Sequence, residues 1–311
     1  MKTFLAAAAG ACAMLLSSVA SHAADRLVFV GHWSESDAFF NVIRNSAQLA
    51  ADQMGVKIEF RNPSGGDLSE MGRLIDQAVA SKPAGIISTV PDENIVDAPL
   101  SNAVAAGIPV VIVNSGSGDI AKKVGALRYI GQAEYEAGKA AGEKAKAANV
   151  KSFVCVNHFF QHPASHQRCN GFADGLGVPL GSQEIDSGTD PNDVVTRTAA
   201  YLKAHPDTQA ILTLGPTGAD PMINWVHEQG AGDKYYFATF DLSKDIAAAM
   251  KEGVVKVAVD QQPFIQGYGA VEVLANFAKF GVLQANDIHS GPGLITKDNL
   301  AQVMTLAGKY R

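Results

Sequence analysis

Polar side chains follow several short apolar runs of this sequence. Asn114 and Asp241 stand directly after such a run, and Gln261 stands one residue further on, at points where buried strands would end. The planar amides of Asn and Gln and the carboxylate of Asp can make paired hydrogen bonds with neighbouring hydroxyl groups. These residue types indicate a site for a neutral ligand that carries several hydroxyl groups. The structural alternative is that the two amides satisfy loop backbone groups and that Asp241 only caps a following helix.

Aromatic and guanidinium groups accompany these polar residues. Trp33, Phe39 and Phe40 lie in or after the loop that follows the first apolar run, and Arg168 lies in the segment RCNGF. Aromatic faces cover the apolar C–H patches of a sugar ring, and a guanidinium presents parallel donors to vicinal hydroxyls. We therefore add all four residues to the candidate site. The structural alternative is that Phe39 and Phe40 belong to the core and that Trp33 covers the surface. For Arg168 the alternative is a surface ion pair.

Strand-like and helix-like segments alternate along the chain from residue 26 to residue 280. Runs such as PVVIV at 109–113 are apolar throughout, as parallel strands covered on both faces require. The segments between such runs repeat apolar residues at helical spacing. This alternation predicts an α/β protein with parallel, doubly wound sheets, and the number of units is sufficient for two sheets. Ligands of such sheets bind beyond the carboxyl ends of the strands, where the candidate residues stand.

Three histidines recur at intervals of four residues, namely His158, His162 and His166. On one helix this spacing would place three imidazoles on the same face as metal ligands. Pro163 indicates that the helix starts only after His162, so the spacing is not helical throughout. We therefore expect no metal site and no cofactor, and we expect at least one of these histidines to reach the ligand.

The first 23 residues match a secretory signal peptide. A lysine at position 2 precedes the apolar run FLAAAAGACAMLL, and the segment SHA at 21–23 places small residues where a signal peptidase cleaves. A lipoprotein signal that uses Cys12 is the alternative, but Ala9 stands where an aliphatic residue is expected. We predict that residues 1–23 are cleaved and that the protein is exported to the periplasm.

Cys155 and Cys169 are the two cysteines that remain after this cleavage. One ends a predicted strand and the other lies on the next helix, in a compartment that is oxidising. A disulfide between them would stabilise the fold by roughly 3 kcal/mol in the chain-entropy model. The alternative is a pair of buried thiols.

The composition argues against several classes of function. The formal net charge is -6 and the isoelectric point is about 5.7, so the chain would repel phosphate backbones and we expect no nucleic-acid partner. The sequence contains no G-x-S-x-G elbow, no H-E-x-x-H motif and no Walker loop. A secreted α/β enzyme is therefore less favoured than a binding protein.

Four motifs give the chain a resemblance to a known family. The motifs are DAFF at 37–40, RCNGF at 168–172, FD at 240–241 and QQP at 261–263. In this order they resemble the polar-x-Phe-Phe opening of the first helix, the R-x-x-G-F helix, the F-D strand end and the Q-x-P crossover. These features belong to periplasmic sugar-binding proteins of the ribose/galactose type, the type I substrate-binding components of ABC transporters.

The resemblance implies two lobes that are joined by a three-segment hinge and that close on a ligand. Lobe 1 would comprise residues 24–130 plus 262–289, and lobe 2 would comprise residues 131–261 plus 290–311. Where the family has an Asn this chain has Gly215, and either Thr217 or Asp220 would take its role. The complete set of predicted ligand-binding residues is Trp33, Asp37, Phe39, Phe40, Asn114, Arg168, Thr217, Asp241 and Gln261.

The implied function is to bind a sugar or sugar alcohol and deliver it to a permease in the inner membrane. Where the ribose-type pattern has Asp-Arg, this chain has Asn114-Ser115, which argues against ribose itself. Pentoses, hexoses, sugar alcohols, inositol derivatives and furanosyl ligands similar to autoinducer-2 stay open. The alternative function is that of a sensor that docks on a membrane chemoreceptor. We expect a monomer without enzymatic activity.

Overall fold

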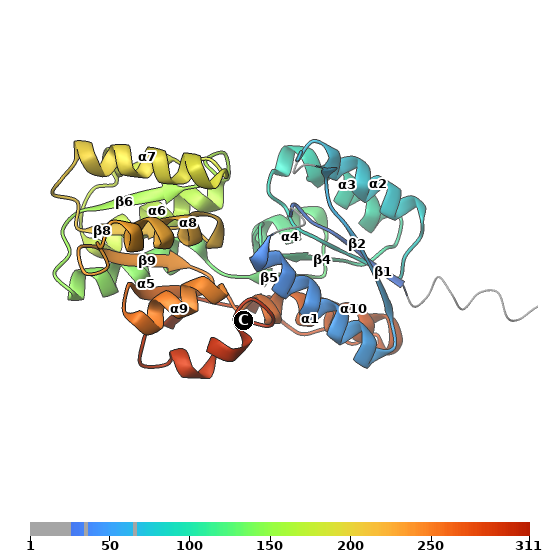
Figure 1. Cartoon of the computed structure of the whole chain (residues 1–311). Coiled ribbons are helices and arrows are strands. Elements are labelled where there is room, and N and C mark those ends of the chain that lie inside the picture. Colours follow the sequence, from blue (N-terminus) through green and yellow to red (C-terminus); the bar gives the residue numbers. More distant parts are fainter. Residues whose placement is uncertain (1–25, 34–36, 65–66) are drawn as a thin grey trace, which may run out of the picture.

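Two α/β lobes lie side by side in the computed structural model of the chain (Figure 1). The structure describes residues 26–33, 37–64 and 67–311. The predicted signal peptide, residues 1–23, lies outside the described residues. Each lobe contains one six-stranded sheet with helices on both faces.

The sheet of lobe 1 is parallel throughout, in the order β11-β5-β4-β3-β1-β2. Its strands are Arg26–Val30 (β1), Lys57–Arg61 (β2), Gly85–Ser88 (β3), Val110–Val113 (β4), Arg128–Gly131 (β5) and Ile288–His289 (β11). β1, β3 and β4 are buried at nearly every position, because helices cover them on both sides. This explains why their sequences are apolar runs without alternation.

The sheet of lobe 2 has the order β12-β10-β9-β8-β6-β7. Its strands are Phe153–Asn157 (β6), Glu184–Asp186 (β7), Ala210–Thr213 (β8), Tyr236–Phe240 (β9), Val255–Asp260 (β10) and Gly293–Ile295 (β12). β12 is antiparallel to β10, and the other pairs are parallel. The predicted fold class, two doubly wound parallel sheets, is therefore confirmed, with one antiparallel edge strand that was not predicted.

Ten α-helices fill the described part of the chain between these strands. In lobe 1 they are Ala38–Met54 (α1), Glu70–Ala80 (α2), Glu93–Ala105 (α3), Gly118–Val124 (α4) and Pro263–Phe280 (α10). In lobe 2 they are Glu134–Ala147 (α5), Pro163–Leu176 (α6), Pro191–Ala204 (α7), Pro216–Glu228 (α8) and Lys244–Glu252 (α9). Three short 3-10 turns complete the list, Gly181–Gln183 (η2), Leu300–Gln302 (η3) and Met304–Leu306 (η4).

The chain passes between the two sheets three times. It leaves lobe 1 after β5 and enters lobe 2 with α5, returns between β10 and α10, and crosses again between β11 and β12. α10 packs against α1 (Figure 1), although about 200 residues separate the two helices in the sequence. Each lobe is thus built from two separate parts of the chain.

Local signals explain where several helices begin. Asp37 accepts a hydrogen bond from the backbone N–H of Phe40 at 3.1 Å, and therefore caps α1. Proline occupies the first turn of α6, α7, α8 and α10, where its missing N–H costs nothing. Ser243 caps α9 through the N–H of Ile246.

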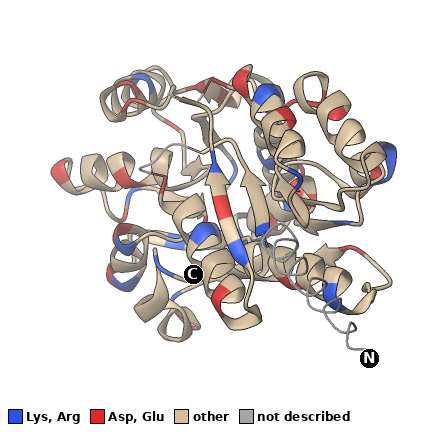
Figure 2. Ribbon diagram, turned by 90° about the vertical axis from the view of Figure 1, so that its right-hand side faces the viewer, with Lys and Arg blue, Asp and Glu red and all other residues tan. Residues whose placement is uncertain are grey.

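Basic and acidic residues are interspersed along the ribbon, and neither sign dominates the face shown in Figure 2. Within the described residues, no helix is long and apolar enough to cross a membrane.

Candidate ligand-binding site

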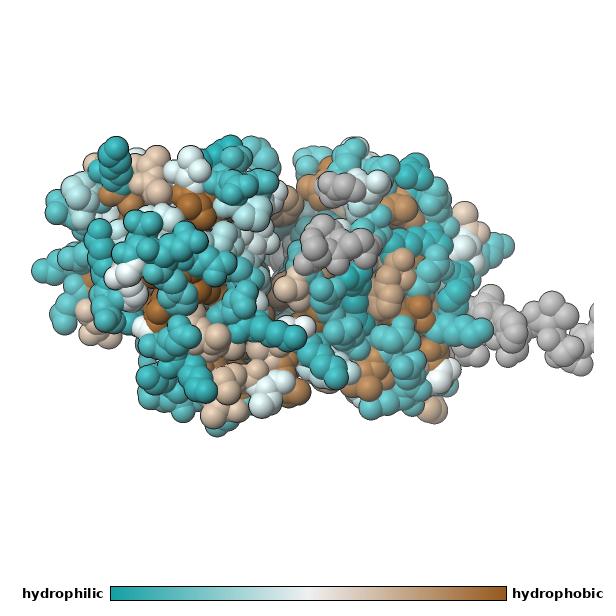
Figure 3. All heavy atoms as spheres, in the orientation of Figure 1, coloured by the Kyte–Doolittle hydropathy of each residue, from teal (hydrophilic) through white to brown (hydrophobic). Residues whose placement is uncertain are grey.

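A cavity of about 720 Å³ lies between the two lobes, where the carboxyl ends of both sheets face each other. The space-filling view in Figure 3 shows the groove between the lobes from one side. The loops after β1, β4, β6, β8 and β9 supply most of its lining, as expected for doubly wound sheets. The polar and aromatic lining residues are His32, Asp37, Phe39, Phe40, Asn114, Ser115, Glu134, His158, Phe159, His162, Ser165, Arg168, Thr189, Thr217, Asp220, Asp241 and Gln261.

All predicted ligand-binding residues except Trp33 line this cavity. They are Asp37, Phe39, Phe40, Asn114, Arg168, Thr217, Asp241 and Gln261. The fold thus brings them together from both lobes and from the hinge. Their contact with a ligand stays a prediction.

Trp33 lies in the hydrophobic core of lobe 1 and not in the cavity lining. Its ring is fully buried, and its centroid is 5.1 Å from that of Phe29 and 5.6 Å from that of Phe40. Burial of the large apolar area of the indole, together with its contacts to other rings, stabilises Trp33 at this position. Phe40 packs on Trp33 and is itself a lining residue. Because Trp33 is fully buried, the alternative interpretation that it covers the surface of lobe 1 does not fit its position either.

The base of the cavity is a hydrogen-bonded chain that crosses from one lobe to the other. Asn114, at the end of β4, donates to the Oε1 of Gln261 at 3.3 Å. The Nε2 of Gln261 in turn donates to both carboxylate oxygens of Asp241, at 2.8 and 3.0 Å. Gln261 lies in the second crossover, so this chain joins β4 of lobe 1, the hinge and β9 of lobe 2.

Two of these residues adopt a left-handed backbone conformation. The φ angle is 59° at Asn114 and 62° at Asp241, and Gln262 in the hinge has a φ of 53°. Asn and Asp are the residues other than glycine that tolerate this region best. The sharp turn directly after β4 and β9 accounts for side chains that reach the cavity from the strand ends.

Arg168 on α6 is held by two elements of lobe 2. Its Nε and Nη2 donate to the carboxylate of Glu134 at 2.7 and 3.0 Å, and its Nη1 donates to the carbonyl of Leu214 at 2.9 Å. The guanidinium carbon also lies 4.4 Å from the ring centroid of Phe240. Within the described residues these bonds use three of the five N–H groups, and the other two can bond to a ligand.

The Glu134–Arg168 pair stabilises the charge of both groups inside the protein. Burial acts to lower the pKa of Arg168, but Glu134, together with Asp241 and Tyr129, outweighs it, so the pKa of Arg168 is raised. Glu134 also accepts a hydrogen bond from Gln132 in the first crossover at 2.9 Å. No sequence motif indicated Glu134, because its role depends on the contact between α5 and α6.

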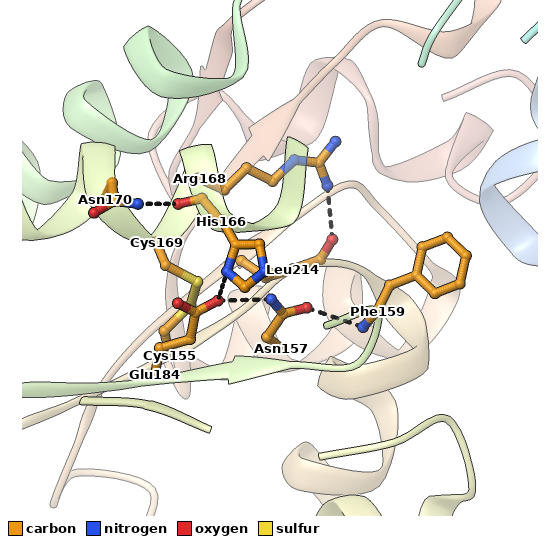
Figure 4. The surroundings of a disulfide bond; sticks show 9 residues. All are labelled: Cys155, Asn157, Phe159, His166, Arg168, Cys169, Asn170, Glu184 and Leu214. Carbon is orange, nitrogen blue, oxygen red and sulfur yellow. Dashed lines mark hydrogen bonds and ion pairs between the residues drawn. A yellow bond between two sulfur atoms is a disulfide. The ribbon is translucent and has the colours of Figure 1, made fainter. Parts of the chain in front are cut away.

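A disulfide between Cys155 and Cys169 connects β6 to α6. Figure 4 shows it beside Arg168, with Arg168 directed toward Leu214 and His166 directed toward Glu184. The bond therefore fixes the helix that carries Arg168 to β6, which lies between β7 and β8 in the sheet of lobe 2.

The helices α5 and α6 approach each other very closely through glycines. A Cβ placed on Gly171 would lie 2.0 Å from the carbonyl oxygen of Tyr135, and one on Gly138 would lie 2.2 Å from the carbonyl oxygen of Arg168. Only glycine fits such a helix crossing without a shift of the backbone. This close approach brings Glu134 and Arg168 within bonding distance.

Burial raises the pKa of three carboxyl groups that line the cavity, those of Asp37, Asp220 and Asp241. Burial raises the pKa of Asp241 well above its ordinary value, although Arg168 and Gln261 act in the opposite direction. Burial also raises the pKa of Asp220 to about 6, against the hydrogen bond that it accepts from Ser243 at 2.7 Å. A ligand hydroxyl that donates to any of these carboxylates would stabilise its charged form.

The three histidines that recur in the sequence do not share one helix face. His162 is the N-cap of α6, with Pro163 in the first turn, and His158 lies in the loop before it. His166 instead pairs with Glu184 at 2.7 Å. Within the described part of the chain, no group of three or more His, Cys, Asp or Glu side chains is arranged to hold a metal ion.

His158 and His162 both line the cavity, as does His32 from lobe 1. Burial lowers the pKa of His32 to about 3, and it lowers the pKa of His158 and His162 to about 4. All three imidazoles are therefore neutral near pH 7, and each offers one donor and one acceptor.

Comparison with known proteins agrees with this architecture. The family model of the periplasmic binding protein domain matches residues 27–281. The chain therefore belongs to the periplasmic binding protein family. The members that serve ABC transporters are periplasmic sugar-binding transport proteins, so the predicted family is confirmed.

Individual relatives extend over almost the whole chain. The xylose/arabinose-binding protein XylF of Sulfolobus acidocaldarius is 22% identical to this chain. The matched region comprises 95% of this chain and 77% of that protein. A carbohydrate transporter of Acidothermus cellulolyticus, solved in complex with myo-inositol, is 33% identical, with a TM-score of 0.84 over 92% of this chain and 99% of that one. A periplasmic sugar-binding protein of an ABC transporter from Legionella pneumophila is 27% identical, with a TM-score of 0.79 over 86% and 99% of the two chains.

Proposed function

We propose that this protein binds a neutral cyclic polyol, a monosaccharide or a cyclitol, between its two lobes. The hydrogen-bonded chain from Asn114 through Gln261 to Asp241 carries the proposal, because it offers amide and carboxylate groups from both lobes at the base of one cavity. Arg168 adds two free N–H groups, and Phe39 and Phe40 add apolar faces. The relative that was solved with myo-inositol supports a ligand of this chemistry.

The cavity disfavours anionic ligands. Among the described residues that line the cavity, Arg168 is the one that is cationic at neutral pH, and the carboxylate of Glu134 already compensates its charge. The carboxylates of Asp37, Asp220 and Asp241 also line the cavity. Burial already disfavours the charged form of these carboxyl groups, so the added charge of a sugar acid or a sugar phosphate would be unfavourable there.

The mechanism is conformational. The lobes, residues 24–130 plus 262–289 and residues 131–261 plus 290–311, act as rigid bodies that turn about the three crossovers. A ligand that bonds to both lobes favours the closed form, because its differential affinity for the two forms shifts their populations. A membrane permease then accepts the closed, monomeric protein in the periplasm, after residues 1–23 have been cleaved. The ligand leaves chemically unchanged.

A thermal-shift experiment on the mature protein, residues 24–311, tests this function. The ligands are myo-inositol, D-xylose, D-arabinose and D-ribose, with D-glucuronate as the charged control. A ligand present at 100 times its Kd stabilises the folded state by about 2.7 kcal/mol, which raises the Tm by roughly 5–10 °C. We expect at least one neutral ligand to do so, to be recovered intact, and to exceed glucuronate. An unchanged Tm with every neutral polyol, or conversion of the ligand, would contradict the proposal.

A further inference from the structure

Three aromatic rings meet across the cleft between the lobes. His32 follows β1 in lobe 1, whereas Phe159 and His162 lie between β6 and α6 in lobe 2. The ring of His32 is parallel to that of Phe159 within 1° at 6.1 Å, and within 17° to that of His162 at 5.7 Å. Phe159 and His162 stack on each other at 5.4 Å. We call these three residues the ring cluster.

Each lobe fixes its own part of the ring cluster. The Nδ1 of His32 lies 2.8 Å from the hydroxyl oxygen of Thr89, and its ring meets the edge of Phe40 at 5.0 Å. In lobe 2, the backbone N–H of His162 donates to the carbonyl of Phe159 at 2.9 Å. The rings are therefore positioned before they meet, and separation of the lobes would break the contact between them.

We propose that His32, Phe159 and His162 form a latch that holds the two lobes together and slows the release of a bound ligand. The proposal rests on the binding function above only for the release step, since the contact itself needs no ligand. Each ring pair of this kind shifts an equilibrium by about two- to tenfold. The latch therefore favours the closed form in the ligand-free protein as well.

The latch depends on the neutral form of the two imidazoles. Burial, followed by the charge of the opposite ring, lowers the pKa of His32 to about 3. Burial, followed by the charges of Arg168 and His166, lowers the pKa of His162 to about 4. A proton on either ring would place a positive charge in a buried site next to another positive group.

The other titratable groups of the cavity lie around the ring cluster. His158 and Arg168 come from lobe 2 beside His162, and the carboxylates of Asp37, Glu134, Asp220 and Asp241 line the same cavity. Because Asp220 has a pKa of about 6, it also titrates when the pH is lowered. Substitution of the histidines themselves is therefore needed to separate their effect from that of the carboxylates.

The sign of the pH dependence follows from linkage. In the open form the rings gain water, and their pKa returns toward the ordinary value near 6.5. The closed form binds fewer protons, so closure is fully favoured above about pH 6.5 and is weakened as the pH falls toward the lowered pKa values. For one histidine, the preference for the closed form falls about tenfold between pH 7.5 and pH 5.5.

The test compares four forms of the mature protein, namely wild type, His32→Ala, the double variant His32→Phe with His162→Phe, and the control His227→Asn. His227 lies on α8 and pairs with the exposed Glu252 at 3.2 Å, away from the cavity lining. Small-angle scattering of the ligand-free proteins at pH 7.5 and pH 5.5 reports lobe opening. Stopped-flow dissociation of myo-inositol, or of the polyol that gives the largest thermal shift, reports release.

We expect His32→Ala to be more open than wild type at pH 7.5 and to release the ligand at least threefold faster. The double variant keeps ring stacking without titration, so we expect it to stay as compact as wild type and to lose most of the opening at pH 5.5. The control should match wild type throughout. The double variant also tests the proposal if His32→Ala fails to fold.

Equal scattering of wild type, His32→Ala and the double variant at both pH values would overturn the latch. The same conclusion follows if the double variant opens at pH 5.5 as much as wild type does. If the scattering responds as expected but no polyol binds to any form, the latch stands and the proposed ligand class fails. If a polyol binds and neither scattering nor release changes, the ligand class stands and the latch fails.

Discussion

Arg168 has two roles that follow from its contacts. It neutralises the buried carboxylate of Glu134, and it presents two further N–H groups at the cavity. The sequence motif R-x-x-G-F predicted the residue, but it gave no reason for its orientation. The ion pair with Glu134 and the bond to Leu214 supply that reason.

Replacement of Arg168 should separate these roles when a second substitution is added. We expect Arg168→Ala to weaken polyol binding more than tenfold and to lower the free energy of unfolding by about 3 kcal/mol, because Glu134 keeps a buried charge without its partner. The double variant with Glu134→Gln should recover most of the stability but not the affinity. Urea unfolding and calorimetry measure the two effects.

Arg197 provides a matched control for this substitution. It lies on α7 of the same lobe, where its exposed side chain pairs with Asp193 at 3.1 Å. Arg197→Ala should leave binding unchanged and should alter stability by less than about 1 kcal/mol. Unchanged affinity in Arg168→Ala would remove this residue from the site.

At the scale of elements, the pair of helices α5 and α6 determines where the charged groups of lobe 2 lie. Gly138 and Gly142 on α5 face Gly171 and Gly175 on α6, and a Cβ on any of them would lie within 2.2 Å of a backbone oxygen of the other helix. The small-residue content of the sequence indicated close packing in general. It could not show which two helices meet, because that depends on the fold of the whole lobe.

The substitution Gly171→Ala should therefore disturb both stability and binding. The added Cβ would lie 2.0 Å from the carbonyl oxygen of Tyr135, so the helices must separate. We expect a loss of roughly 1–3 kcal/mol in the free energy of unfolding. Arg168 moves with α6 relative to Glu134, so polyol affinity should also fall, as measured by calorimetry.

Gly232 serves as the control glycine for this experiment. A Cβ at this position would meet only a side-chain carbon of Val254, at the ordinary distance of 3.4 Å. Gly232→Ala should change neither Tm nor affinity appreciably. A Gly171→Ala protein with unchanged Tm would show that the helix pair tolerates separation.

At the scale of the whole molecule, the C-terminal residues connect lobe 2 to lobe 1 and to the hinge. The carbonyl of Lys309 accepts a hydrogen bond from Asn45 on α1 at 3.1 Å, and the ring of Tyr310 meets that of Phe264 at 6.0 Å. Arg311 forms an ion pair with the buried carboxylate of Asp260, at the end of β10. The last residues thus stabilise the second crossover.

Arg311→Ala should destabilise the protein in a pH-dependent manner. Burial raises the pKa of Asp260, and Arg311 acts against this, so its removal should raise that pKa further. When a carboxyl group has a raised pKa in the folded state, the free energy of unfolding of the protein falls as the pH rises through that pKa. The loss relative to wild type, about 1–3 kcal/mol at pH 7.5, should therefore shrink at pH 4.5.

Urea unfolding at the two pH values measures this difference. Lys309→Ala is the control, because the backbone carbonyl that binds Asn45 is retained. An equal loss at both pH values in Arg311→Ala would mean that Asp260 does not titrate in this range.

The sequence by itself determined the fold class and most of the candidate site. Apolar runs without alternation require strands that are covered on both faces, and the residue after such a strand lies at the edge where ligands bind. Asn114, Asp241 and Gln261 could be found from this rule alone, because their placement depends on local strand ends. The aromatic type of Phe39 and Phe40 indicated these two residues, and the family motif DAFF added Asp37.

Only the tertiary structure decided which of the remaining residues reach the cavity. Trp33 and His32 are neighbours in the sequence, yet one is buried in the core of lobe 1 and the other faces lobe 2. Glu134 enters the site because α5 packs on α6, and Arg311 reaches Asp260 because the chain returns to the hinge. These contacts join residues that are distant in sequence, and their existence depends on how the two lobes pack, which no local pattern of residues encodes.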